Sequence, residues 1–331
     1  MEPPTALSVL IVGCGNIAGG LDADNAEWVN KPQTHAGAYT AHGGFTLLAC
    51  VEPDPGRRAD FAERWGVGHA YATLDEAFAD GHHFDVVSIC SSTGSHASDL
   101  RQVLDLHPRV VFCEKPLTND LALSRDIVSE YENTSTKLVV NYSRHWDTRV
   151  SELAEQLSSG LWGKIRAVTG VYTKGLLNNG SHLLDLLLML FRDIRVVAAG
   201  PSRFDMWEED ATVPAMLVAD VDIPVTINCG HAHDFTLFEL EVITERGVIA
   251  MRDSGNSWET RLPTPSTIHT GYTVLGKPTT SPGTLTYAFA GAIAEIYDLS
   301  QTDAAGSCTG TDALAVQSLC QSIRDLSELH G

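Results

Sequence analysis

The amino-acid sequence predicts an α/β protein of two domains, and three observations support that prediction. The chain has 331 residues, about twice the common domain length of ~100–200 residues. Over the first 140 residues, near-continuous apolar runs alternate with helical segments, the pattern of a parallel, doubly wound sheet. Between Arg195 and about Arg261, strand-like segments follow one another without long helices, as they do in a largely antiparallel sheet.

The first domain is expected to contain strands that are short apolar runs. In chain order they are Leu7–Val12, Phe45–Val51, Val86–Cys90, Val110–Cys113 and Lys137–Asn141. The clearest helices between them are Arg57–Trp65, Ser95–Leu104 and Leu121–Tyr131. Strands joined by helices pair in parallel, and a parallel strand is covered on both faces, which explains why these runs are apolar throughout.

The second domain is expected to hold a large, open, mixed sheet that is mostly antiparallel. Its expected helices are Arg149–Leu157, Ser181–Phe191, Tyr287–Leu299 and Gly310–Leu329. Its expected strands are Ile165–Tyr172, Val196–Ala199, Ala215–Asp222, Val225–Cys229, Phe235–Ile243 and Val248–Met251. The stretch Pro263–Pro282 is rich in Pro, Thr, Ser and Gly and is expected to be a loop. We therefore predict domains of residues 1–142 and 143–331.

Charge and cysteine usage limit the class of partner and the compartment. The chain has 42 acidic and 22 basic residues, a net charge of −20, so neither nucleic acid nor a membrane surface is an expected partner. Its seven cysteines form no CxxC pair, which favours reduced thiols in the cytoplasm. The N-terminus lacks a signal-peptide pattern, and the apolar stretch Leu183–Phe191 is far shorter than the ~20 residues of a membrane span.

A glycine-rich sequence follows the first strand and matches the fingerprint GxGxxA. Gly13 allows a tight turn, Gly15 lets a pyrophosphate approach the backbone, and the small Ala18 lets the next helix pack closely. Asn16 and Ile17 complete the loop at the helix N-terminus, where such a pyrophosphate binds. The sequence therefore predicts a Rossmann domain that binds NAD or NADP.

The end of the second strand bears on the choice between the two dinucleotides. Glu52 is expected to accept hydrogen bonds from the adenosine ribose and to repel a 2′-phosphate, which favours NAD. Arg57 and Arg58 follow closely and leave NADP possible, because a guanidinium binds that phosphate. The polar stretch between Gly19 and His35 lengthens the spacing to Glu52. We interpret it as an insertion interrupting the first helix, either a surface loop or a flap over the cofactor.

A lysine follows the fourth strand in the sequence Glu114-Lys115-Pro116. The carboxyl ends of parallel strands face the ligand crevice of a doubly wound sheet. Lys115 is therefore well placed for proton transfer or for polarising a substrate oxygen. A surface ion pair between Glu114 and Lys115 is the alternative interpretation.

These motifs together resemble the glucose–fructose oxidoreductase / inositol dehydrogenase / MocA (Gfo/Idh/MocA) family over nearly the whole chain. The motifs that carry the resemblance are Gly13–Ala18, Cys90–His96, Glu114–Pro116, Asn141–Arg144 and Gly180–Asp185. The resemblance implies a catalytic Lys115 and an acid/base role for His182 beside the reacting hydroxyl. It also implies that the cofactor is lined by Ser91, Ser92, Thr93, His96 and Glu114.

The chain departs from the family pattern at two positions. Ser92 stands where a proline is usual, and Asn178 stands where many members carry aspartate four residues before the histidine. An amide takes up no proton, so Asn178 is expected to orient a substrate hydroxyl or the imidazole.

Read from the residues alone, His182 lies at the start of a helix, with Ser181 as its N-cap. The helix dipole would keep His182 neutral as a base, and Asp185, one turn on, would orient it, contact substrate or cap the helix. Lys174 and Arg144 are further candidates for substrate contact. Alternatively, His182 has only a structural role, and Lys174 is simply exposed to solvent.

We expect an NAD(P)-dependent oxidoreductase that moves a hydride between nicotinamide and a secondary hydroxyl or ketone of a sugar, nucleotide sugar or cyclitol. One alternative is transient oxidation with elimination or hydrolysis, and another is a non-catalytic dinucleotide-binding regulator. A homodimer or homotetramer is expected, because strands 215–251 carry enough apolar residues for helices to cover one sheet face and for the other face to need a partner. No metal site is expected, since His231 and His233 have no third ligand nearby in the sequence.

Overall fold

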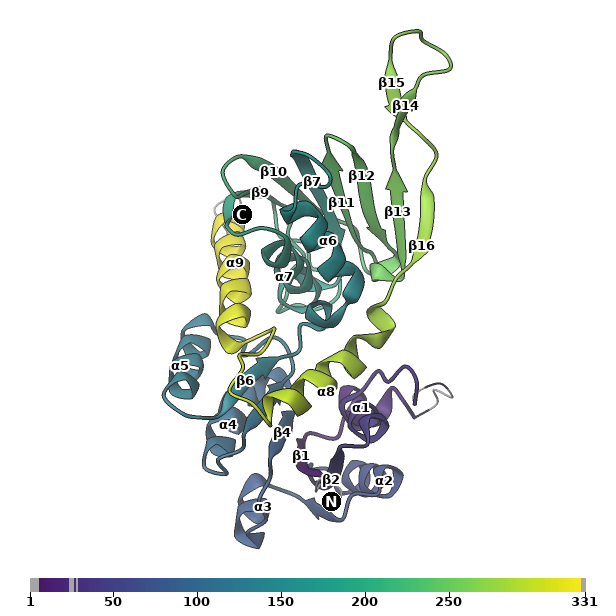
Figure 1. Ribbon diagram of the computed structural model, residues 1–331. Helices are drawn as coiled ribbons and strands as arrows, with labels where there is room; N and C mark the ends of the chain where they lie inside the picture. Colours follow the sequence, from purple (N-terminus) through teal and green to yellow (C-terminus); the bar gives the residue numbers. More distant parts are fainter. Residues whose placement is uncertain (1–5, 24–26, 28, 329–331) are drawn as a thin grey trace. The chain divides into compact units, whose positions relative to one another are not determined.

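The computed structural model describes residues 6–23, 27 and 29–328, and the chain forms two compact units. The first comprises Met1–Trp146 and Thr286–Leu314, and the second comprises Asp147–Leu285 and Ala315–Gly331. The sequence predicted a single division after residue 142. In the structure the chain returns to the first unit after the second sheet is complete (Figure 1).

The first unit contains a six-stranded parallel sheet with strand order β3-β2-β1-β4-β5-β6. Its strands are β1 (Leu7–Val12), β2 (Phe45–Val51), β3 (His69–Tyr71), β4 (Val86–Ile89), β5 (Val110–Cys113) and β6 (Lys137–Val140). Every residue of β4 and β5 is buried, so both faces of the central strands are covered. The predicted Rossmann sheet is confirmed.

The helices of this unit include one that comes from far along the sequence. They are α1 (His35–His42), α2 (Pro55–Trp65), α3 (Leu74–Asp80), α4 (Thr93–Leu104), α5 (Leu121–Glu132) and α8 (Ala288–Leu299). On α8, Ala292, Ile293 and Ile296 are fully buried in the same core as Val9 and Phe112. The apolar stripe of α8 therefore explains why residues 286–314 belong to the first unit.

The second unit is built on an eight-stranded mixed sheet of order β16-β13-β12-β11-β7-β10-β9-β8. Its strands are β7 (Ile165–Tyr172), β8 (Ile194–Ala199), β9 (Ala215–Ala219), β10 (Ile223–Cys229), β11 (Phe238–Thr244), β12 (Gly247–Arg252), β13 (Ser257–Arg261) and β16 (Thr279–Pro282). Only β7 and β10 pair in parallel among these described strands; the other neighbours are antiparallel. The predicted open mixed sheet is confirmed.

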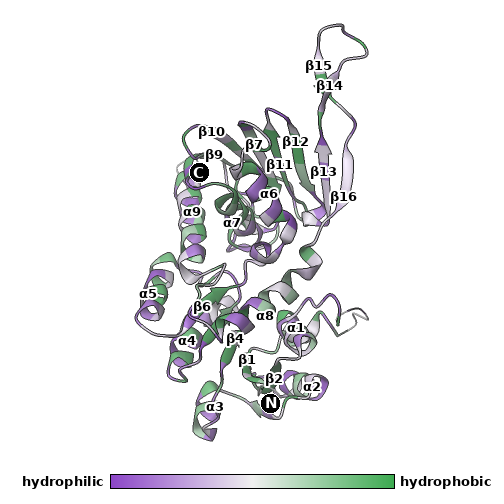
Figure 2. Ribbon diagram, viewed as in Figure 1, coloured by the Kyte–Doolittle hydropathy of each residue, from purple (hydrophilic) through white to green (hydrophobic). Residues whose placement is uncertain are grey.

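The helices of the second unit are α6 (Thr148–Ser158), α7 (Ser181–Leu190) and most of α9 (Gly310–Glu328). Figure 2 shows α7 as mainly hydrophobic, and Leu183 on this helix packs so closely on Gly170 of β7 that a Cβ there would lie 2.7 Å from its side chain. Of the described helices, none combines the length and the apolar character needed to cross a bilayer.

The structure corrects the sequence prediction for Pro263–Pro282 and agrees with the predicted interruption of the first helix. Pro263–Pro282 is not only a loop: it holds β16 and a hairpin of β14 (Pro263–Pro265) and β15 (Thr273–Leu275), which extends beyond β13 (Figure 1). The glycine-rich loop leads only into a π-helical turn, η1 (Asn16–Gly20), and α1 starts at His35. Residues 24–26 and 28, within the predicted insertion, lie outside the described residues.

Candidate functional site

The glycine-rich loop has one glycine that the protein's own packing requires and one that it does not. Gly13 has φ +85°, and a Cβ on it would lie 2.5 Å from the backbone nitrogen of Ser91. A Cβ on Gly15 would meet nothing within 4 Å. The space beside Gly15, at the start of η1, therefore fits a group from outside the chain, as a pyrophosphate would need. Ala18 is fully buried, as close packing of η1 requires.

Glu52 follows β2 and holds the glycine-rich loop. Its carboxylate accepts hydrogen bonds from the Cys14 amide at 3.0 Å and from the Asp54 amide at 3.0 Å. The two arginines behave differently. Arg58 donates to the backbone oxygens of Glu52 and Pro53, whereas Arg57 is 56% exposed and its Nε lies 3.9 Å from Glu52 Oε1.

An open cavity of about 510 Å³ lies at this end of the parallel sheet, a size common for small-molecule and cofactor sites. Five predicted cofactor residues are among those that line it: Gly13, Glu52, Arg57, Ser91 and Ser92. A neighbouring cavity is lined by Gly15, Asn16 and again Arg57. Ile17 packs against the hydrophobic core instead.

The segment after β4 combines partly exposed hydroxyls with a buried histidine. Ser92 is the N-cap residue of α4 and Thr93 is its first residue. His96 is only 1% exposed, with Nδ1 3.0 Å from the Pro116 oxygen and Nε2 3.1 Å from the Ser91 oxygen. His96 thus bridges the segments that follow β4 and β5, so its position supports their geometry.

Glu114 and Lys115 follow β5 at the carboxyl edge of the sheet. Glu114 Oε1 accepts hydrogen bonds from Asn141 Nδ2 at 2.6 Å and from His35 Nε2 at 2.9 Å. Burial opposes ionisation of Glu114, but His35, Asn141 and the charge of Lys115 outweigh it and lower its pKa below the ordinary value. The carboxylate is therefore ionised beside Lys115, which is joined to Pro116 by a cis peptide bond.

His35 was not anticipated from the sequence. It is fully buried, and its Nδ1 lies 3.1 Å from Ser88 Oγ, which in turn lies 2.9 Å from the Tyr39 hydroxyl. The chain from Tyr39 through Ser88 and His35 to Glu114 connects α1, β4 and β5. No local sequence pattern signals it, because His35 and Glu114 are 79 residues apart.

In the second unit, Asn178 and His182 lie on one continuous helical segment. The π-helical stretch η3 (Gly175–Gly180) runs directly into α7, and Ser181 has helical dihedral angles. The predicted N-cap at Ser181 is therefore wrong: its Oγ donates to the Leu177 oxygen at 2.6 Å. His182 is also not at the helix start, so the predicted dipole effect on its protonation does not apply.

The true start of this segment is held by Asp210, which the sequence did not single out. Asp210 accepts hydrogen bonds from the amides of Leu177 at 2.9 Å and Asn178 at 2.8 Å. A Cβ on Gly175, which has φ +76°, would lie 2.2 Å from Asp210 Oδ2. Arg324 donates to the same carboxylate at 3.1 Å. A carboxylate thus neutralises the positive end of the helical segment, two turns before His182.

The predicted substrate contacts of this unit have defined backbone positions. Lys174 has φ +67°, and its amide donates to the buried Asp205 at 3.1 Å. Asn178 Nδ2 donates to the Lys174 oxygen at 3.2 Å, and Asp185 is 1% exposed. Lys174 and Asn178 are therefore neighbours, whereas Asp185 is buried on α7.

The remaining predicted residues lie elsewhere. Arg144 belongs to the 3₁₀ turn η2 (Ser143–Trp146) of the first unit and is 5% exposed. His231 and His233 lie in a turn after β10, not on a strand, with ring centroids 5.3 Å apart.

Comparison with known proteins bears on the first unit most directly. Residues 7–142 match the model of GFO_IDH_MocA, an oxidoreductase family with an NAD-binding Rossmann fold. An inositol 2-dehydrogenase of Rhizobium meliloti (strain 1021) is 25% identical over 218 residues, covering 65% of this chain and 62% of that protein. A D-apiose dehydrogenase of Rhizobium rhizogenes is 26% identical over 216 residues, covering 60% and 58%. The chain thus spans less than two thirds of the length of these relatives.

Solved structures match over nearly the whole chain. An oxidoreductase from Agrobacterium radiobacter, in complex with NAD+, L-tartaric acid and magnesium, has a TM-score of 0.76 at 18% identity and covers 98% of this chain and 97% of its own. The WlbA dehydrogenase from Bordetella pertussis, in complex with NADH and UDP-GlcNAcA, has a TM-score of 0.76 at 16% identity with the same coverage. These likenesses concern the fold of both units.

Proposed function

We propose that this chain is a member of the GFO_IDH_MocA oxidoreductase family, whose model matches residues 7–142, and that it oxidises a secondary hydroxyl of a sugar, nucleotide sugar or cyclitol, or reduces the matching ketone. The observation that carries the proposal is Glu114, hydrogen-bonded by His35 and Asn141, next to Lys115 at the carboxyl edge of a sheet that matches an NAD-binding fold. Relatives named as inositol and apiose dehydrogenases support the substrate class.

The cofactor is proposed to be NAD in preference to NADP. Glu52 lines the cavity and directs a carboxylate toward the glycine-rich loop, where a 2′-phosphate would meet negative charge. The Arg58 guanidinium already donates hydrogen bonds to backbone oxygens. Of the two arginines, Arg57 is therefore the one that could bind the 2′-phosphate of NADP. Gly15, Asn16, Ser91, Ser92 and Thr93 are proposed to contact the rest of the dinucleotide.

The proposed chemistry divides between two side chains. The nicotinamide supplies or accepts the hydride when NAD is bound. Lys115 is proposed to stabilise the developing alkoxide or to relay its proton, and Glu114 keeps a negative charge beside that ammonium. His182 is proposed to exchange the proton of the reacting hydroxyl. Lys174, Asn178, Arg144 and Asp185 are proposed to bind or orient the polyhydroxylated substrate.

The decisive experiment is a substrate panel with the purified full chain. Sugars, nucleotide sugars and cyclitols are incubated with NAD+ while NADH absorbance is followed, and products are analysed separately. NADH formation with one class supports the proposal. Substrate consumption without NADH would indicate transient oxidation with elimination or hydrolysis. Tight NAD binding with no turnover of any class would indicate the regulator instead.

Cofactor preference is tested by titrating NAD+ and NADP+ into the wild type, Glu52→Gln and Arg57→Ala. We expect the wild type to bind NAD+ more tightly, and Glu52→Gln to narrow the difference by about tenfold, because a charge repelling the 2′-phosphate is lost. Tighter NADP+ binding by the wild type, reversed in Arg57→Ala, would assign the preference to Arg57.

A homodimer or homotetramer in the cytoplasm is also proposed. Val197, Met216 and Ile243, on three strands of the mixed sheet, are 47%, 57% and 36% exposed, so this sheet leaves apolar side chains that a second copy would cover. All seven cysteines are free thiols, which supports a reducing compartment. Light scattering that gives a 35.7 kDa particle at micromolar concentration would contradict the oligomer.

A further inference from the structure

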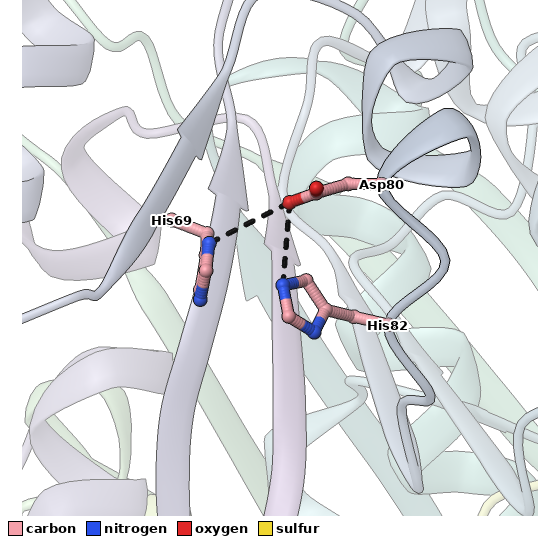
Figure 3. A group of neighbouring side chains, drawn as sticks. All are labelled: His69, Asp80 and His82. Carbon is pink, nitrogen blue, oxygen red and sulfur yellow. Dashed lines mark ion pairs between the residues drawn. The ribbon is translucent and has the colours of Figure 1, made fainter.

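Three side chains with metal-binding chemistry meet at the edge strand of the first unit. His69 lies on β3, Asp80 is the last residue of α3, and His82 follows two residues later. Figure 3 shows both imidazoles directed at the same carboxylate. Asp80 Oδ2 lies 3.6 Å from His69 Nδ1 and 3.2 Å from His82 Nε2, and the three ligand atoms all lie within 4.8 Å of one another.

We propose that His69, Asp80 and His82 form a binding site for a divalent transition-metal ion such as Zn²⁺. Bonds of ~2.0–2.2 Å at tetrahedral angles place two zinc ligands about 3.4 Å apart. The distances from Asp80 to the two imidazoles bracket this value. Two imidazoles and one carboxylate also match the ligand types that zinc, nickel and copper prefer over magnesium or calcium.

The local backbone builds this arrangement from residues that the sequence separates. Gly81 has φ +74° and ends α3 in the left-handed conformation, so the chain reverses and brings His82 back beside Asp80. Residues two apart on a strand share one face, and Tyr71 on β3 accordingly donates its hydroxyl to the same Asp80 oxygen that faces His69. A hydrogen bond to a ligating carboxylate orients it for the metal.

The exposure of the three side chains leaves room for the rest of a coordination shell. Their exposed fractions are 38% for His69, 47% for Asp80 and 32% for His82, so water completes the shell and the ion has a path of entry. The helix α3 starts near the end of the sheet where Glu52 lies and ends at Asp80, farther from that end. The metal therefore ties α3 to the edge strand, away from the cofactor cavity, and stabilises the fold.

The test is calorimetric titration of Zn²⁺ into the metal-stripped full chain. The variants are His82→Ala and Asp80→Asn, with His83→Ala as the matched control, since His83 instead faces Asp85 at 3.7 Å and is 66% exposed. We expect one zinc equivalent in the wild type and the control. Binding should weaken at least tenfold in His82→Ala and Asp80→Asn.

Two further readouts separate this site from other ligands of the chain. Zn²⁺ should raise the melting temperature of the wild type by a few degrees and leave that of His82→Ala unchanged. Co²⁺ should give the visible absorption of nitrogen and oxygen ligands. Equal zinc binding in wild type and His82→Ala, no saturable binding in the wild type, or thiolate-to-Co²⁺ charge-transfer absorption from a cysteine would each overturn the proposal.

Discussion

The two units hold their proposed functional side chains in different ways. In the first, Glu52 and Lys115 follow directly on parallel strands, so the hydrogen-bonded sheet sets where they lie. In the second, His182 lies on a helical segment whose start is held by Asp210, from the irregular chain between β8 and β9. Both units use a carboxylate to bind two backbone amides, but only the first takes it from the end of a strand.

This difference predicts which part of the site keeps its geometry when one side chain is substituted. A strand-end residue is supported by the whole ladder beneath it, and its position changes little when one side chain is lost. A helix start that depends on one carboxylate moves when that carboxylate is removed, because buried amides are then left without an acceptor. Substitutions that act directly on chemistry and substitutions that act on position should therefore separate experimentally.

The largest effect is expected from the two proposed proton-transfer groups. Lys115→Ala and His182→Ala should each lower kcat by ~10²–10⁴, while the Kd for NAD+ changes by no more than a few-fold. The exposed Lys164→Ala is the control for a lysine lost at the surface. Steady-state kinetics with the substrate found by the panel measure the effect. Turnover within a few-fold of wild type in both variants would refute the assigned acid/base roles.

An intermediate effect is expected at Asp210, which supports position and not chemistry. Asp210→Asn should cost about 1–2 kcal/mol of unfolding free energy and lower kcat about tenfold, since the segment carrying His182 shifts. Asn178→Ala is the comparison: it removes the side-chain hydrogen bond to the Lys174 oxygen, and should lose less of both stability and kcat. Urea unfolding and kcat of the two variants are measured together. If Asp210→Asn were as stable and as active as Asn178→Ala, Asp210 would have no special role in positioning the helical segment.

Most of the fold could be predicted because strands and helices have local sequence patterns. β1, β2, β5 and β7 have the predicted bounds, since each is an apolar or alternating run between turn signals. The three-residue β3 and the short α3 offered too little periodicity. The hairpin β14–β15 was hidden by its proline and threonine content, and the return of α8 to the first unit depends on what its apolar stripe packs against, which no pattern within α8 specifies.

The same distinction between local and long-range signals applies to the residues of the candidate site. Gly13, Glu52 and Lys115 were predictable because a motif and a strand end mark them. Asp210 and His35 were not, because their importance comes from partners that folding brings together: Asp210 binds amides 32 and 33 residues away, and His35 binds Glu114 across 79 residues. A single buried aspartate or histidine is common in sequences and carries no signal by itself.

The smallest effect on turnover is expected from His35, which contacts Glu114, the residue before Lys115. His35→Phe should keep the packing, since the His35 ring already lies 4.7 Å from the Phe112 ring and 5.4 Å from the Phe289 ring, centroid to centroid. It removes the imidazole donor and leaves the Asn141 amide as a donor to Glu114, so the pKa of Glu114 should rise and kcat should fall a few-fold, with the acidic limb of the pH profile displaced to higher pH. His35→Gln, which keeps a donor, is the control.

The same substitution predicts a pH-dependent loss of stability. The pKa of Glu114 is lower in the folded chain than its ordinary value of 4.5, so its ionisation stabilises the fold above that pH, and this contribution is lost as the pH falls through the lower folded-state pKa. His35→Phe should therefore cost about 1–2 kcal/mol at pH 7, and the gap to wild type should shrink below pH 4.5. Urea unfolding of wild type and His35→Phe at pH 7 and below pH 4.5 measures this difference in stability. A difference that stays constant would mean that packing, and not the carboxylate, accounts for the loss.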